Sequence, residues 1–254
     1  MKIVNVPALV FTLGLLAQWL SAQTGAYLTR SRRILGEAER EDLGVILAAA
    51  LTLLGLIIGF SFSMAVTRYD QRKNYEEEEA NAIGTEYLRA GLLRSDDATK
   101  VRELLRSYLD QRISFYASHD AHELEQINNS TAQLQNDLWS TVQAAAGAQQ
   151  TPVVALAVSG MNDVLNSQGY TQAAWRNRIP IAAWALMVAI AICCNLLIGY
   201  NARHIERKII RFFILPLIVS IAFFLIDEMD TPRGGVIRVV PQNLVSLSRS
   251  LRAP

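Results

Sequence analysis

The fold is decided by the stretch LGVILAAALTLLGLIIGFSFSMAVTRYDQRKNYEEEEANAIGTEYLR, residues Leu43–Arg89. Its first 24 residues, Leu43–Val66, carry no charge, and an uncharged apolar run of about 18 or more residues is typical of a membrane span. No glycine or proline stop signal separates this run from the polar segment that holds four consecutive glutamates, Glu76–Glu79. The stretch therefore predicts one long helix that leaves the bilayer and continues into water.

The composition of the whole chain agrees with a membrane protein that also has an aqueous part. Of its 254 residues 51% are hydrophobic, and the mean hydropathy is +0.20. This composition is too apolar for an ordinary soluble domain and too polar for a chain that lies wholly in lipid. The net charge of +1 and the absence of any nucleic-acid motif exclude a nucleic-acid partner from the prediction.

Three further apolar runs complete the predicted membrane part. Proline is absent from Ala8 to Thr151. Between the second and third spans, apolar residues recur at helical spacing from Val101 to Ile113 and from Leu124 to Val142. We predict an all-α integral membrane protein with a long helical aqueous insert between spans 2 and 3. Its four transmembrane helices are predicted at Ile3–Ala22, Leu43–Val66, Ile179–Tyr200 and Ile209–Ile226.

The predicted domain organisation follows from these spans. Residues 1–66 and 179–226 each hold two spans joined by a short basic loop, and 67–178 form the helical aqueous domain. Residues 227–254 form an acidic-Pro-Arg-Gly-Gly turn and an amphipathic tail. Breaks within the insert are predicted at 95–97, 119–120, 147–152 and 166–169, where polar and turn-forming residues gather.

The charges of the short loops predict the orientation. Basic residues concentrate in the two loops, which hold Arg30, Arg32, Arg33, Arg40, Arg203, Arg207, Lys208 and Arg211. The positive-inside rule places such loops in the cytoplasm, so the insert and both termini are predicted outside a bacterial inner membrane. The absence of Lys and Arg between Arg112 and Arg176 supports this side. Arg68, Arg72 and Lys73 oppose it because they follow span 2 directly.

The glutamate run is the first candidate site. On a helix Glu76 and Glu79 share one face, and in a symmetric oligomer such carboxylates form a ring that attracts cations. The alternative is a plain solvated face whose glutamates pair with basic residues one turn earlier. The full set of predicted pore or ion-contact residues is Ser61, Ser63, Asp70, Glu76, Glu79 and Asn81.

Glycines and the last turn form two further sets. Gly55 and Gly59 make a GxxxG pattern, and with Gly84 they are predicted to let another helix approach closely. The turn after span 4 is predicted to be either an ion-paired structural turn, with Arg233, Arg68 or Arg72 as partner, or a cation vestibule. Its residues are Asp227, Asp230, Arg233 and Gly234.

Two segments resemble a family of bacterial four-span membrane proteins called bestrophin-like. They are LLGLIIGFSFSMAVTRYDQRKNYEEEEANAIGTEYLRAGLL, residues 53–93, and IDEMDTPRGGVIRVVPQNL, residues 226–244. The resemblance implies an oligomeric four-span helical protein that forms an ion channel. Bestrophins themselves are pentameric channels with a cytosolic helical domain, so the resemblance implies a cytoplasmic insert, opposite to the side that the loop charges predict. Span 2 lacks the bestrophin neck pattern of a small apolar residue, proline and an aromatic residue.

These observations predict an oligomeric, cation-favouring ion channel, with span 2 near the pore and the acidic collar at its mouth. The alternative is a non-conducting membrane scaffold or sensor whose helical domain binds a protein partner. Neither nucleophile–base pairs nor phosphate loops nor metal-ligand spacings are found, so we predict neither an enzyme nor a cofactor nor a metal site. The predicted partners are membrane lipid, inorganic ions and further copies of this chain.

Overall fold

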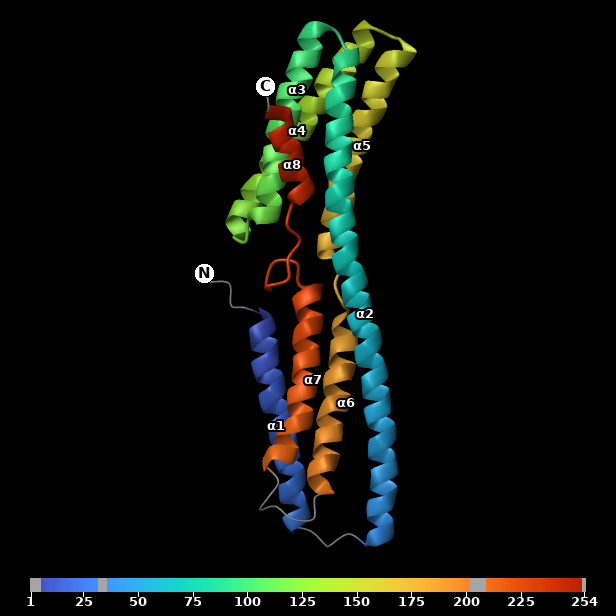
Figure 1. Ribbon diagram of the computed structural model, residues 1–254, viewed down its shortest axis with the longest axis vertical. Coiled ribbons are helices and arrows are strands. Elements are labelled where there is room, and N and C mark those ends of the chain that lie inside the picture. Colours follow the sequence, from blue (N-terminus) through green and yellow to red (C-terminus); the bar gives the residue numbers. More distant parts are fainter. Residues whose placement is uncertain (1–5, 32–35, 202–208, 253–254) are drawn as a thin grey trace. The chain divides into compact units, whose positions relative to one another are not determined.

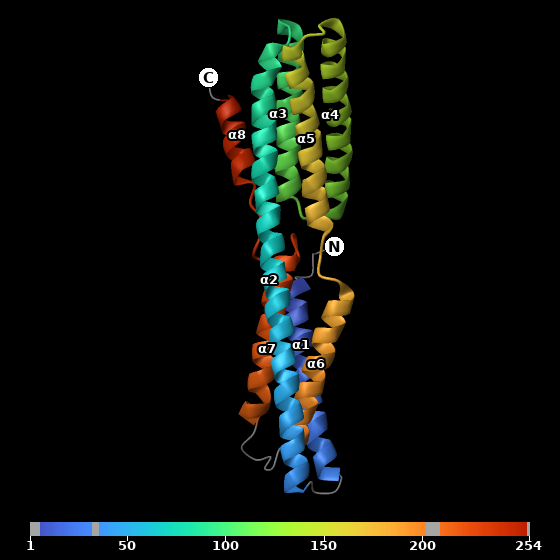
Figure 2. The same cartoon turned by 90° about the vertical axis from the view of Figure 1, so that its right-hand side faces the viewer.

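The computed structural model describes residues 6–31, 36–201 and 209–252. These residues form helices and no strand, as Figures 1 and 2 show, which confirms the predicted all-α class. The elements are α1 (Val6–Ser31), α2 (Glu37–Arg89), the 3-10 helix η1 (Ala90–Leu92), α3 (Ser95–Ala117), α4 (Ala121–Ala148), α5 (Pro152–Arg176), α6 (Ile181–Tyr200), α7 (Ile209–Asp230) and α8 (Gln242–Arg252).

The chain divides into two compact units. Unit 1 contains residues 1–68 and 178–238, and unit 2 contains residues 69–177 and 239–254. The predicted long helix is present as α2, which has no break over its 53 residues and contributes to both units. The amphipathic tail helix α8 belongs to unit 2.

In unit 1, α1 packs against α6 and α7, and the three helices run side by side in Figure 1. Gly25 of α1 and Gly199 of α6 allow the closest approach. A Cβ atom at Gly25 would collide with the Leu196 carbonyl, and one at Gly199 would collide with the Ala22 carbonyl. Small residues at a helix crossing are the usual means by which membrane helices pack closely.

The interior of unit 1 combines an apolar core with one neutral polar cluster. Leu54, Met187 and Phe223 are buried in the core. Beside them Gln18 donates to Ser220 at 3.1 Å, and Asn195 donates to Gln18 at 3.2 Å. Hydrogen bonds between neutral side chains on different helices stabilise their contact where water is absent.

The described part of the chain has three segments that are long and apolar enough to cross a membrane. They lie within Glu37–Leu92, Pro152–Tyr200 and Phe212–Asp230. Helix α1 is long enough but is not among them, and the first residues of the predicted span Ile3–Ala22 lie outside the described residues. The count of four spans therefore stays a prediction.

The loops behind the predicted orientation lie mostly outside the described residues. These include Arg32, Arg33, Arg203, Arg207 and Lys208. The side of the membrane that holds the insert therefore stays a prediction as well.

Unit 2 is built from long helices packed around one apolar core. Leu105 of α3, Leu138 of α4 and Met161 of α5 are fully buried in it. Asp120 is the N-cap of α4, because its side chain accepts hydrogen bonds from the backbone N–H groups of His122 and Glu123. Thr151 caps α5 in the same way, directly before Pro152.

The predicted break at residues 166–169 is wrong, because α5 continues from Pro152 to Arg176. Its buried face passes through that segment, with Val164, Ser167 and Thr171 turned inward. Packing of this face against the core outweighs the weak helix preference of the sequence Asn-Ser-Gln-Gly.

Candidate functional site

The part of α2 in unit 2 has two different faces. Its inner face carries Arg72, Glu76, Glu79, Ile83 and Glu86, at spacings of three and four, and each is at most 1% exposed. The outer face carries the exposed residues Asp70, Asn74, Glu77, Asn81 and Thr85, at the same spacings. This helix therefore turns a charged face into the protein and a second polar face outward.

The position of Glu76 and Glu79 corrects the sequence interpretation. Both readings of the glutamate run, as a pore collar or as a solvated face, assumed that these carboxylates contact water. In the structure they are buried inside unit 2, whereas Glu77 and Glu78 are exposed. The run straddles the boundary between the two faces, because successive helical residues are separated by about 100°.

Glu79 forms an ion pair with Arg112 of α3, and both side chains are fully buried. The Arg112 Nε donates to Glu79 Oε1, while the Tyr116 and Thr171 hydroxyls each donate to Glu79 Oε2 at 3.2 Å. Burial, followed by the negative charge of Glu79, raises the pKa of Tyr116, so its hydroxyl keeps the proton that it donates. The carboxylate thus links α2, α3 and α5.

Glu76 holds the tail helix α8. Its carboxylate accepts the backbone N–H groups of Asn243 at 2.9 Å and Leu244 at 3.0 Å, and the Asn243 side-chain amide at 2.7 Å. A negative charge at a helix N-terminus satisfies free N–H groups and interacts favourably with the helix dipole. Glu76 therefore caps the N-terminus of α8 from a different helix, in the way that an N-cap side chain caps its own helix.

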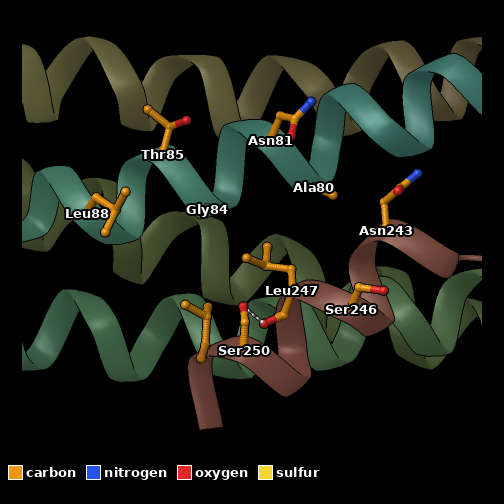
Figure 3. Close-up of a pocket in the computed structure, with 10 residues that line it drawn as sticks. Ala80, Asn81, Gly84, Thr85, Leu88, Asn243, Ser246, Leu247 and Ser250 are labelled. Carbon is orange, nitrogen blue, oxygen red and sulfur yellow. Dashed lines mark hydrogen bonds between the residues drawn. The ribbon is translucent and has the colours of Figure 1, made fainter. Parts of the chain in front are cut away.

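A groove of about 440 Å³ remains between α2 and α8 (Figure 3). Ala80 and Gly84 of α2 lie along it, opposite Leu247 and Ser250 of α8. A Cβ atom at Gly84 would lie 3.1 Å from the Leu247 side chain. The glycine that the sequence analysis assigned to helix packing thus lies against α8.

Arg72 lies at the other end of the inner face. Its Nε donates to the Ala174 carbonyl at 3.2 Å, and its Nη2 donates to the Asn177 carbonyl at 3.3 Å. These carbonyls are at the C-terminus of α5, where a cation is favoured by the helix dipole. Arg72 and Glu76 therefore stabilise opposite ends of two different helices.

In unit 1 the apolar part of α2 is largely uncovered by the rest of the chain, and only 6% of its most apolar window is buried. Gly55 and Gly59 are exposed, and no other helix in the described part of the chain comes within 4 Å of a Cβ atom added at either position. Ser63 is exposed, whereas Ser61 is buried at 6% exposure. The two serines predicted together as pore residues therefore point to different sides of α2.

The acidic turn after α7 is held by contacts inside unit 1. Asp230 forms a salt bridge with Arg68 at 3.1 Å, and its other oxygen accepts the Ile179 N–H at 2.9 Å. Glu228 accepts the backbone N–H groups of Val236 at 2.6 Å and Ile237 at 3.1 Å. Its carboxylate fills the space that a side chain at residue 235 would need, so this turn requires a glycine at Gly235.

The other predicted turn residues are Asp227, Arg233 and Gly234. Arg233 and Gly234 are half-buried, and Asp227 accepts the Thr231 hydroxyl at 3.2 Å. Arg68 is thus one of the predicted partners, and it pairs with Asp230 of this turn. The role as a structural turn stays a prediction. The vestibule role stays a prediction.

A family model described as bestrophin-like domain matches residues 10–244. The chain belongs to the bestrophin-like family. This confirms the resemblance seen in the sequence, and with the apolar helices it shows a membrane protein.

Solved structures of bestrophin homologues share the fold. A variant of a bacterial bestrophin homologue from Klebsiella pneumoniae has a TM-score of 0.60 and 14% identity, covering 99% of this chain and 98% of that chain. The homologue solved by zinc phasing has a TM-score of 0.60 and 13% identity, covering 97% and 99%. A structure described as a membrane protein variant has a TM-score of 0.63 and 12% identity, covering 96% of each chain. A comparison with curated proteins finds no match.

Sequence reasoning missed several residues of the buried network in this bestrophin-like chain. The position of Arg112 could have indicated a buried charge, because this arginine continues the apolar stripe of Leu105 and Tyr108 at helical spacing. An arginine on an apolar stripe requires a buried partner. Nothing in the sequence indicated that Glu79 is that partner, or that Thr171 and Asn243 would join the inner face of α2.

Proposed function

We propose that this bestrophin-like protein is an oligomeric ion channel of the bacterial inner membrane in which the exposed face of α2 borders the ion path. The single observation that carries the proposal is a row of small and hydroxyl-bearing residues on an otherwise apolar helix. They are exposed and follow one face at spacings of three and four: Thr52, Gly55, Gly59, Ser63 and Thr67.

The neighbouring exposed residues show why this row is unusual. Leu53, Leu56, Phe60 and Met64 also lie on the surface of unit 1 and follow the same spacing. Large apolar side chains are suited to lipid, whereas a row of Gly, Ser and Thr is suited to close helix contact or to water. Both uses of the row require another copy of the chain, because no other segment among the described residues covers Gly55 or Gly59.

Polar residues on the outer face of α2 in unit 2 support a preference for cations. Asp70 and Glu77 are exposed carboxylates, and Asn81 lies on the same face. Repeated around a symmetry axis, exposed carboxylates form the rings that attract cations. In the proposed channel Asp70 and Glu77 take the ion-contact role assigned to Glu76 and Glu79, whose carboxylates are occupied by Asn243 and Arg112.

The test is current through planar bilayers that contain the purified full chain, with cysteines placed on α2. In a background with Cys193→Ala and Cys194→Ala, we expect a water-soluble thiol reagent to reduce the current of Gly59→Cys and Ser63→Cys. The matched controls are Phe60→Cys and Met64→Cys, which lie on the large apolar row of the same helix. Their currents should not change.

A second measurement tests the ion preference. Asp70→Asn and Glu77→Gln should each shift the reversal potential in a salt gradient toward anions, while Glu78→Gln on the same helix should shift it less. Absence of current at any voltage from a correctly assembled oligomer would contradict the channel and favour the scaffold. Equal block at all four cysteine positions would contradict the assignment of the row.

A further inference from the structure

Glu86 is the one carboxylate on the inner face of α2 that neither the buried network nor the proposed channel uses. Its side chain is fully buried, and neither carboxylate oxygen has a hydrogen-bond partner among residues 6–31, 36–201 and 209–252. This differs from Glu76 and Glu79, which lie on the same face and accept several hydrogen bonds each. An ionised carboxylate in such a place is strongly unfavourable, since nothing replaces the water that it loses.

The site is built around Gly160 of α5. A Cβ atom at Gly160 would collide with Glu86 Oε2 and with the Arg89 guanidinium, so both side chains occupy the space that the glycine leaves. The Arg89 guanidinium lies 3.9 Å from Asp163, in an ion pair that is partly exposed. The carboxyl of Glu86 therefore lies at the contact of α2 with α5, with Arg89 nearby but directed to another acid.

The charged groups around Glu86 can be named by element. The charged group on α2 is Arg89, and its positive charge lowers the pKa of Glu86. The charged group on α5 is Asp163, and its negative charge raises the pKa of Glu86. On α3, Arg102 and Arg106 both donate hydrogen bonds to Tyr87, the residue that follows Glu86. Helix η1 contains no titratable residue.

Burial is the largest influence on this carboxyl. It raises the pKa of Glu86 from 4.5 to about 8, despite the opposing field of Arg89. The carboxyl is therefore neutral at neutral pH, and it loses its proton to bulk water under mildly alkaline conditions.

We propose that Glu86 is a proton switch that keeps α5 packed on α2 while its carboxyl is neutral and loosens this contact when it ionises. The physical reason is that, among the described residues, no group donates a hydrogen bond to either Glu86 oxygen, although the Arg89 guanidinium lies close by. An ionised Glu86 must either draw Arg89 away from Asp163 or admit water beside Gly160, and both changes disturb the contact between the two helices. This proposal does not depend on whether the protein conducts ions.

The experiment is hydrogen exchange of the full chain in detergent, followed over the α5 amides around Gly160 and corrected for the intrinsic pH dependence of exchange. In the wild-type protein, corrected exchange should accelerate about tenfold between about pH 6 and about pH 9, as the local contact opens. Glu86→Gln should exchange slowly throughout this range. The matched control Glu77→Gln removes an exposed carboxylate from the same helix and should behave as wild type.

Gly160→Ala provides a second arm. The added Cβ displaces the ends of two flexible side chains, Glu86 and Arg89, so the protein should fold and α5 should exchange quickly at every pH. The switch is overturned if wild type and Glu86→Gln accelerate equally with pH, or if the wild-type rate does not change.

Discussion

The interiors of the two units satisfy their polar groups by different means. Away from the acidic turn that follows α7, the buried side chains of unit 1 that hydrogen-bond between α1, α6 and α7 are neutral, as with Gln18, Asn195 and Ser220. In unit 2 the corresponding interior groups carry charge, as with Glu79 and Arg112. Water can reach the surface of a helical domain in solution and lower the cost of its buried charges, but it does not reach the hydrocarbon core of a membrane. The same helix, α2, supplies an apolar segment to one unit and a charged inner face to the other.

The largest expected effect comes from breaking the buried ion pair of unit 2. Arg112→Ala leaves the Glu79 carboxylate uncompensated in the core and should lower the free energy of unfolding by about 4 kcal/mol. Denaturant titration followed by circular dichroism measures this change. The double variant Glu79→Gln with Arg112→Met should recover most of the loss, because it leaves no charge unpaired. Equal losses in the single and double variants would mean that the charge itself is unimportant.

Glu86 makes the stability of unit 2 depend on pH. The cluster of Gln18, Asn195 and Ser220 in unit 1 has no titratable group and gives no such dependence. Because the pKa of Glu86 is raised from 4.5 to about 8 in the folded protein, the folded state binds this proton more tightly than the unfolded state. The stabilisation from the bound proton is complete below about pH 4.5 and declines as the pH rises to about 8.

Glu86→Gln should remove this decline, so the variant should gain stability over wild type as the pH rises through this window. Thermal melting at a series of pH values measures the difference, with Glu77→Gln as the control that keeps the wild-type slope. A variant that follows the wild-type slope would contradict the raised pKa.

A smaller effect is expected at the helix that Glu76 holds. Glu76→Ala removes the acceptor for the Asn243 and Leu244 N–H groups and should cost about 1 kcal/mol, in the range of a lost helix cap. Limited proteolysis should then cleave within α8 faster than in wild type, whereas Glu77→Ala should leave the cleavage rate unchanged. Equal protection of α8 in both variants would mean that Leu244 and its apolar neighbours suffice to hold it.

The smallest effect is expected in unit 1. Asn195→Leu removes the hydrogen bond to Gln18 within the neutral cluster and should cost about 0.6 kcal/mol, the average for hydrogen bonds between membrane helices. The same denaturant titration applies, with Cys193→Leu as an exposed neighbour on α6. A loss as large as that of Arg112→Ala would show that the two interiors do not differ in the way described.

Much of the fold was predictable because it depends on periodicity and on stop signals. The uninterrupted pattern from Leu43 to Arg89 predicted α2, and Thr151 with Pro152 marked the start of α5. The false break at residues 166–169 shows the limit of this approach, because local preference is weak beside the packing of a buried face. The candidate site was less predictable, since Glu76, Glu77, Glu78 and Glu79 are the same residue type and only their partners distinguish them.

The sequence by itself determined that this is a helical membrane protein of the bestrophin-like family, with one long helix whose apolar part leads into an acidic part. The length of an apolar run and the spacing of residues along a helix are properties of the sequence alone, so they can be determined without a structure. Only the tertiary structure decided which glutamates are structural and which face water. That choice depends on Arg112, Asn243 and Gly160, which lie far from the glutamate run in the chain and meet α2 only when the helices pack.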